Sequence, residues 1–85
     1  PVGADQLEFV LNDISLEGVS VYTRTALEPH WQLLRGKKIR LSDLYDLCDA
    51  ITRHYREDGY TLARAWLPEQ VINGAPVRIT VDEGG

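Results

Sequence analysis

Alternating apolar and polar residues at the start of the chain predict a β-strand from Leu7 to Gly18. Every second residue from Leu7 to Leu11 is apolar, the period at which strand side chains return to one face. The alternation resumes one residue out of phase at Ile14 and Leu16. A one-residue slip moves side chains to the other face, and a β-bulge restores the phase. We therefore expect a single strand with a bulge at residues 12–13.

The next segment predicts a short helix over about residues 25–34. Thr25 is the expected N-cap and Glu28 its capping-box partner. Pro29 fits poorly at the fourth helical position, so a start near Glu28 is the alternative. Gly36 follows where a C-cap glycine is expected. The apolar face of this helix would consist of Leu27, Trp31 and Leu34.

A second helix is the clearest element of the pattern. Ser42 is a favourable N-cap, and Asp43 and Asp46 suit the positive end of the helix dipole. Gly59 stands where a helix end favours a left-handed residue. One apolar stripe runs along the helix, formed by Leu44, Leu47, Cys48, Ile51 and Tyr55.

Two further alternating segments predict strands at Tyr60 to Leu67 and at Val77 to Val81. Pro68 ends the first, and Asn73-Gly74 indicates a turn between them. The element order is thus β-α-α-β-β. Two helices cover one face of a three-stranded sheet, so the fold class is α+β with two layers.

Composition excludes several kinds of site and adds less to the prediction of the fold. The chain has 85 residues, a net charge of -4 and 44% hydrophobic residues, which indicates one small globular domain. One cysteine excludes an internal disulfide and a cysteine-rich zinc site. No apolar run is long enough for a membrane helix. Because the chain starts at Pro1 without Met, we expect a piece of a longer protein, with residues 1–6 as the end of a linker.

The chain offers little catalytic chemistry. His30 and His54 have no nearby serine in a nucleophile elbow. Cys48 lies on the apolar stripe, where a buried thiol is inert. The acidic residues at positions 43, 46 and 49 drift around the helix and fit a solvated face better than a cation site. From these residues we therefore expect neither a catalytic site nor a metal site.

A basic segment between the helices raises an RNA-binding alternative. Residues 35–40 hold four of the nine Lys and Arg residues. A KH-type module also begins β-α-α-β-β and clamps RNA with a GxxG loop between its helices. Here the loop reads Gly36-Lys37-Lys38-Ile39, without the second glycine, and the net charge is acidic. The other interpretation is a solvated turn, with Ile39 and Leu41 in the core.

The uncovered face of the sheet suggests partner binding. Arg64, Trp66, Arg78 and Thr80 would lie there, and the indole with its arginines would form a cation–π surface. An outer strand also exposes backbone groups to which an extended peptide can add itself. The alternative is that Trp66 packs under the loop of residues 68–75.

An ordered set of motifs resembles a known family. The second helix closes as T-x-x-Y-x-x-x-G-Y at Thr52 to Tyr60, L-P-x-Q follows at Leu67 to Gln70, and V-x-E-G ends the pattern at Val81 to Gly84. With the first strand, these resemble a POTRA (polypeptide-transport-associated) domain, and more narrowly the first POTRA of two-partner-secretion transporters of the haemolysin-activator type. The resemblance covers residues 7–84. Pro29 and the basic turn depart from the family pattern.

The resemblance implies a mixed sheet and a periplasmic domain of an outer-membrane β-barrel protein, with no enzyme activity and no cofactor. Its partners would be a secreted exoprotein in extended form and the transporter's own later POTRA and barrel domains, with no nucleic acid. Binding would use the edge of the strand at residues 60–67 and the neighbouring helix. The candidate site residues are Arg64, Trp66 and Gln70, with Arg56 and Arg78 as electrostatic helpers. A POTRA-like domain from barrel assembly or cell division is a further alternative.

Overall fold

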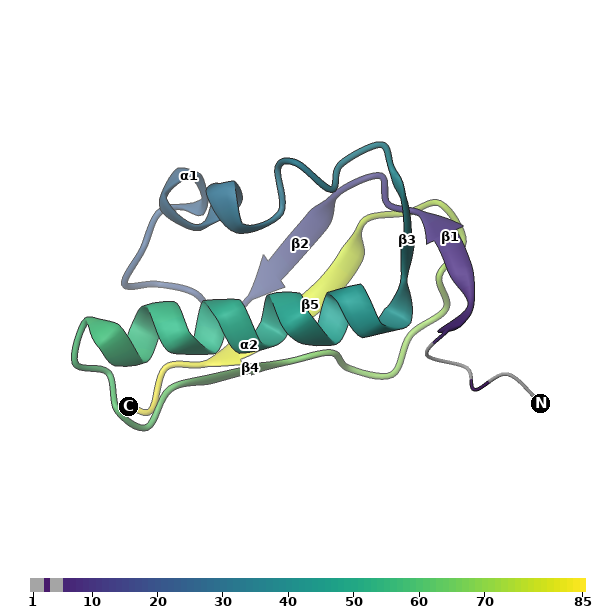
Figure 1. Cartoon of the computed structure of the whole chain (residues 1–85). Coiled ribbons are helices and arrows are strands. Elements are labelled where there is room, and N and C mark those ends of the chain that lie inside the picture. Colours follow the sequence, from purple (N-terminus) through teal and green to yellow (C-terminus); the bar gives the residue numbers. More distant parts are fainter. Residues whose placement is uncertain (1–2, 4–5) are drawn as a thin grey trace.

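A mixed sheet of three strands, in the order β2-β5-β4, forms one layer of the molecule (Figure 1). The structure is a computed structural model that describes residue 3 and residues 6–85, so the expected linker at residues 1–6 lies largely outside the described residues. β2 (Ile14–Glu17) runs parallel to β5 (Val77–Asp82), and β4 (Arg64–Trp66) pairs antiparallel with the other side of β5. The predicted three-stranded mixed sheet is confirmed.

The helix α2 (Leu41–Glu57) lies across one face of this sheet. All five residues of its predicted apolar stripe are buried. The predicted N-cap Ser42 is wrong, because Arg40, two residues earlier, is the N-cap. The Asp43 carboxylate accepts the backbone N–H of Arg40 at 2.8 Å and so fixes the first turn there. The helix ends as predicted, with Gly59 in the left-handed region at φ 96°.

The first helix is much shorter than predicted. α1 spans Arg24–Leu27 and is followed by a 3-10 turn, η2, at Glu28–His30. Thr23 rather than Thr25 is the N-cap, since its hydroxyl accepts the Ala26 N–H at 3.2 Å. Pro29 lies in the 3-10 turn, where its missing N–H and fixed φ end the α-helix.

The N-terminal segment forms two strands in different sheets instead of one bulged strand. β1 (Glu8–Val10) pairs antiparallel with β3 (Lys38–Arg40), placing Phe9 opposite Ile39. The chain then leaves this small sheet and enters the larger one as β2. The change of phase in the sequence therefore marks a change of sheet. β3 also replaces the solvated turn expected for the basic segment, although Ile39 is buried as predicted.

The predicted strand at residues 60–67 is reduced to β4. Residues 60–63 form turns instead, in which the Ala63 N–H donates to the Tyr60 carbonyl at 3.1 Å. Ala63 is buried, whereas Arg64 and Trp66 are exposed on the opposite side, as the alternation predicts.

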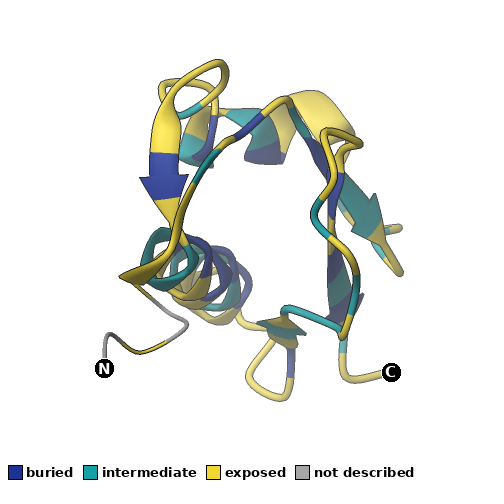
Figure 2. Cartoon of the chain, turned by 90° about the vertical axis from the view of Figure 1, so that its right-hand side faces the viewer, coloured by how far each residue is buried: buried dark blue, intermediate teal, exposed yellow. Residues whose placement is uncertain are grey.

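Helices and sheet share one core, and Figure 2 shows their buried segments facing the same interior. α1 and the residues after it contribute Leu27 and Trp31, so both helical segments pack on the same face of the sheet. The opposite face carries the alternate residues of β5 and β4 and stays open to solvent. Among the described residues, no helix has the length and hydropathy needed to cross a membrane.

Candidate functional site

The outer strand β4 and the helix α2 lie side by side (Figure 1). Two shallow hollows along α2 form the two ends of a groove, and their lining comes from α2 and from the segment after β4. One end of the groove is lined by Asp49, Thr52, Arg53 and Arg56. The other end, with a volume of about 390 Å³, is lined mainly by apolar groups: Leu41, Tyr45, Leu67, Pro68, Glu69, Gln70 and Ile72. Residues 41, 45, 49, 52 and 56 recur every three or four positions and so form one stripe of α2. The groove thus changes from apolar to charged along the helix.

Arg64 and Trp66 form a stacked pair on the open face of the sheet. The Arg64 guanidinium carbon lies 4.7 Å from the centroid of the indole ring, which confirms a cation–π contact. The Trp66 side chain is not buried beneath the loop of residues 68–75, because the residue remains 37% exposed. A flat aromatic surface backed by a positive charge is therefore available beside the strand edge.

Arg78 lies on the same face but does not join this pair. Its guanidinium forms an ion pair with Glu17 on β2 at 3.1 Å and donates to the Glu69 carbonyl at 3.4 Å. It thus connects both outer parts of the sheet across β5. The cation–π surface consists of Arg64 and Trp66 without Arg78.

Gln70 is engaged with the backbone of β5. Its side-chain amide donates to the Arg78 carbonyl at 2.9 Å, and its oxygen accepts the Arg78 N–H at 2.8 Å. Pro68 stands where β4 would continue, and proline has no N–H to donate to the ladder. The Gln70 amide takes the place of that peptide group. This accounts physically for the L-P-x-Q motif and gives Gln70 a structural contact next to the groove.

Arg56 lies on the other side of the strand, within the groove. Its Nε–H donates to the Ala63 carbonyl at 3.1 Å. Thr52, one helical turn earlier, accepts the Ala65 N–H through its hydroxyl at 2.9 Å. The five candidate residues therefore occupy two surfaces. The open face has the Arg64–Trp66 pair and Arg78, and the groove along α2 has Arg56 at one end and Gln70 at the other.

Sequence reasoning missed Thr52 and the apolar end of the groove. Thr52 stood only within a family motif, although a threonine in the middle of a helix often uses its hydroxyl to bind backbone. Tyr45 had a clearer signal, because it lies outside the apolar stripe of α2 and is 48% exposed. A large aromatic residue on a polar helix face is a common feature of binding surfaces.

The titratable groups of the core offer no nucleophile. Burial raises the pKa of the Cys48 thiol to about 11, with Asp49 adding to the effect, so the thiolate is not populated near neutral pH. His30 Nε2 and His54 Nδ1 lie 2.8 Å apart, and burial together with the neighbouring imidazole lowers the pKa of His30. In the described part of the chain, neither ring is hydrogen-bonded to a serine or cysteine, and no three potential ligands are placed to hold a metal ion.

The basic segment is not a loop of the GxxG kind that the RNA-binding alternative requires. Arg35 is held in ion pairs with Asp13 at 3.3 Å and with Glu28 at 3.1 Å. Lys38 and Arg40 belong to β3, in a paired strand and not in a loop. Residues 38–40 therefore form a strand where a GxxG clamp would need a loop.

Comparison with protein families gives a match over almost the whole described chain. The model of the family described as POTRA domain, ShlB-type, matches residues 9–84. Among curated proteins, the heme/hemopexin transporter protein HuxB of Haemophilus influenzae is 41% identical over 49 residues, which is 58% of this chain. The chain spans only 9% of the length of that relative.

Solved structures share the fold. CdiB from Escherichia coli superposes with a TM-score of 0.81 at 26% identity, over 93% of this chain and 15% of that one. The N-terminal domain of Omp85 from Thermosynechococcus elongatus gives 0.77 at 26% identity, over 87% of this chain and 32% of that one. POTRA1-2 of Omp85 from Anabaena gives a TM-score of 0.75 at 27% identity, over 89% of this chain and 48% of that one.

Proposed function

Since the chain belongs to the POTRA family of the ShlB type, found in two-partner-secretion transporters, we propose that it docks an exoprotein in the periplasm and guides it to an outer-membrane β-barrel. The exoprotein would arrive unfolded, and its N-terminal secretion domain would bind in extended form. The transporter's own later POTRA and barrel domains would receive it. No step of this task requires a catalytic group or a cofactor.

One observation carries the proposal at the level of residues: β4 is an outer strand of the sheet and has a groove beside it. An extended chain that adds to a sheet edge gains backbone hydrogen bonds without regard to its side chains. Such binding suits a client that must be recognised before it folds. Pockets along the edge then select among side chains, and the apolar end around Leu41 and Tyr45 would accept an apolar residue.

Charge favours a client segment with acidic or polar residues. Arg53 and Arg56 line one end of the groove, and Arg64 stands on the other side of the strand. These three arginines outnumber the two carboxylates that line the groove, Asp49 and Glu69, although the whole chain has a net charge of -4. Arginine and tryptophan are the residue types that most often anchor protein interfaces. We assign the Arg64–Trp66 pair as the anchor, with Gln70 and Arg78 keeping the strands in register and Arg56 acting within the groove.

The test replaces the anchor in the full transporter. The double variant Trp66→Ala with Arg64→Glu removes the indole and inverts the charge on an exposed surface, so the domain should still fold. We expect secretion of the exoprotein to fall at least tenfold, which corresponds to about 1.4 kcal/mol of binding. A matched control, Leu33→Ala with Lys37→Glu, changes an exposed apolar residue and an exposed cation away from β4.

Circular dichroism of the isolated chain checks that both double variants keep the native fold. Unchanged secretion by the anchor variant, with a native spectrum, would place the docking site elsewhere. Equal losses in the anchor and control variants would show that any charge change on this domain impairs transport.

A further inference from the structure

Along the outer edge of the sheet, backbone polar groups of β4 and of Ala63 just before it point away from β5. Arg64 and Trp66 stand opposite Asp82 and Thr80 of β5, and Ala65 stands opposite Val81 between them. In an antiparallel pair, hydrogen-bonded and non-bonded positions alternate. The Ala65 N–H donates to the Thr52 hydroxyl of α2, so Ala65 is at a non-bonded position and its N–H points outward. Ala63, two residues earlier, directs its carbonyl to the same side.

The Ala65 N–H and the Ala63 carbonyl are both already occupied by α2. The Thr52 hydroxyl accepts from the Ala65 N–H at 2.9 Å, and the Arg56 Nε–H donates to the Ala63 carbonyl at 3.1 Å. An added strand would offer the same two partners, one acceptor and one donor. The spacing also matches. One helical turn from Thr52 to Arg56 rises about 6 Å, and two strand residues from Ala65 back to Ala63 span about 6.7 Å.

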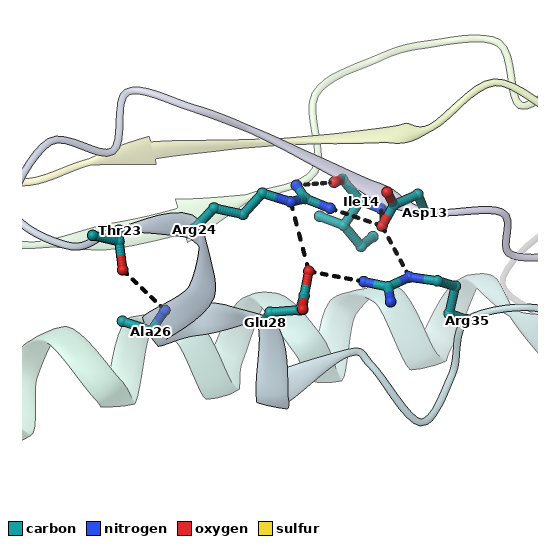
Figure 3. Close-up of polar contacts among 7 residues, drawn as sticks. All are labelled: Asp13, Ile14, Thr23, Arg24, Ala26, Glu28 and Arg35. Carbon is teal, nitrogen blue, oxygen red and sulfur yellow. Dashed lines mark hydrogen bonds and ion pairs between the residues drawn. The ribbon is translucent and has the colours of Figure 1, made fainter.

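The opposite edge of the sheet is closed in a different way. On β2, the Ile14 N–H donates to the Asp13 carboxylate, and the Ile14 carbonyl accepts from Arg24 at 2.6 Å. Figure 3 shows that Arg24 and Asp13 belong to a network of four charges, completed by Glu28 and Arg35. Opening this edge would break several ion pairs at once.

The edge of β4 is covered by fewer interactions. The cover consists of one neutral hydroxyl and one guanidinium on an exposed residue. The Thr52 hydroxyl places its own hydrogen on the Cys48 carbonyl at 2.9 Å, so only a lone pair serves the strand. At the β4 edge, each of these two hydrogen bonds to α2 can be replaced by one hydrogen bond to an added strand.

We propose that Thr52 and Arg56 form a latch that stands in for an added strand, and that client docking displaces it. This rests on the proposed function, because the displacing strand is the exoprotein segment. The latch protects an exposed edge from pairing with other chains, which is a known hazard of outer strands. It also weakens docking, because each client bond replaces an existing one.

The test compares Thr52→Ala with Thr52→Ser in the isolated chain, which has a core of its own. Alanine removes the acceptor for the Ala65 N–H and favours the helix, whereas serine keeps the hydroxyl. Amide hydrogen exchange is measured at Ala65 without any client. We expect exchange at Ala65 to accelerate about 3- to 10-fold in Thr52→Ala, the range for one net hydrogen bond, and to stay unchanged in Thr52→Ser.

Docking is measured with overlapping labelled peptides that tile the N-terminal part of the exoprotein secreted by the full transporter. We expect Thr52→Ala to bind about 3- to 10-fold more tightly than the unsubstituted chain, and Thr52→Ser to bind equally. Weaker or equal binding by Thr52→Ala, or unchanged exchange at Ala65, would overturn the latch. A failure of every peptide to bind any of the three chains would count against the proposed function, while the exchange result would still decide whether the edge is covered.

Discussion

Glu83 connects three parts of the fold, and neutralising it should measurably weaken the domain. Its carboxylate accepts the Ser20 hydroxyl at 2.6 Å, the backbone N–H groups of Ser20 and Val21 at 2.9 and 3.0 Å, and the Tyr55 hydroxyl at 2.6 Å. These bonds join the end of β5 to the loop before α1 and to the buried stripe of α2. Glu83→Gln keeps the shape of the side chain but removes the charge.

The pKa of Glu83 sets the size of the effect. Partial burial raises this pKa, but the hydrogen bonds from Ser20, Tyr55 and Val21 outweigh burial and lower it from 4.5 to about 2. A difference of that size between the folded and unfolded states corresponds to about 3 kcal/mol at most. Screening by solvent at this partly exposed position reduces the expected contribution to about 2 kcal/mol.

The linkage between proton binding and folding gives the direction of the pH dependence. Because the folded pKa is depressed, the stabilisation is complete above about pH 4.5 and is lost as the pH falls toward 2. Urea denaturation, followed by circular dichroism, is carried out between pH 7 and pH 2.5. At pH 7 we expect the free energy of unfolding of Glu83→Gln to lie about 2 kcal/mol below that of the unsubstituted chain. This gap should close as the pH approaches 2.

Glu69→Gln is the matched control, because Glu69 is exposed and its carboxylate has no hydrogen-bond partner among the described residues. It should leave stability within about 0.5 kcal/mol of the unsubstituted chain at every pH. A Glu83→Gln gap that stays constant from pH 7 to pH 2.5 would refute the electrostatic account and indicate a packing effect. A gap below about 0.5 kcal/mol at pH 7 would show that the four hydrogen bonds contribute little net energy.

Two further substitutions test other features of the fold by urea denaturation. Gly18→Ala should destabilise the domain by about 3 kcal/mol or more, since Gly18 has φ +89° and an added Cβ would collide with a backbone carbonyl of β5. Gly36→Ala should lose only about 1 kcal/mol, because φ is +80° there but the space is open; equal losses would refute the collision. Gln70→Ala should lower the free energy of unfolding by about 1–2 kcal/mol, because two backbone groups of β5 lose the amide as their partner. Gln32→Ala, at an exposed position, should change the free energy of unfolding little. Equal effects of the two substitutions would argue against a structural role of Gln70.

Periodicity predicted the long elements because their burial depends on local spacing. The α2 stripe and the alternation of β5 each follow one repeat over several turns or pairs, and packing on a single core preserves that repeat. The segment from Leu7 to Leu16 has the same kind of pattern with one phase change. A bulge within one strand and a step between two sheets produce identical local patterns. Only the distant partner β3 distinguishes them, and pairing across about 30 residues has no local signal.

The predicted bounds of the short first helix were wrong for a related reason. Thr23 and Thr25 both offer a hydroxyl at the start of the first helix, and residue preference alone does not choose between them. The choice depends on where the chain enters from β2, which is set by the ion pairs of Arg24 with Asp13 and Glu28. Pro29 then limits the helix to four residues, a consequence that the sequence does indicate.

Only part of the candidate site can be predicted from the sequence. The stacking of Arg64 on Trp66 follows from strand alternation, because residues two apart share a face. The roles of Thr52 and Arg56 do not follow, since a threonine and an arginine one helical turn apart are ordinary on a solvated helix. They acquire a function only because α2 lies beside β4 and runs against it, so that one helical turn matches two strand residues. Any helix packed in this way against an outer strand can cover its edge with side chains at i and i+4. The covering residues must therefore be identified from the helix–strand geometry. In the proposed latch, the strength of client docking would depend on them as well as on the residues that touch the client.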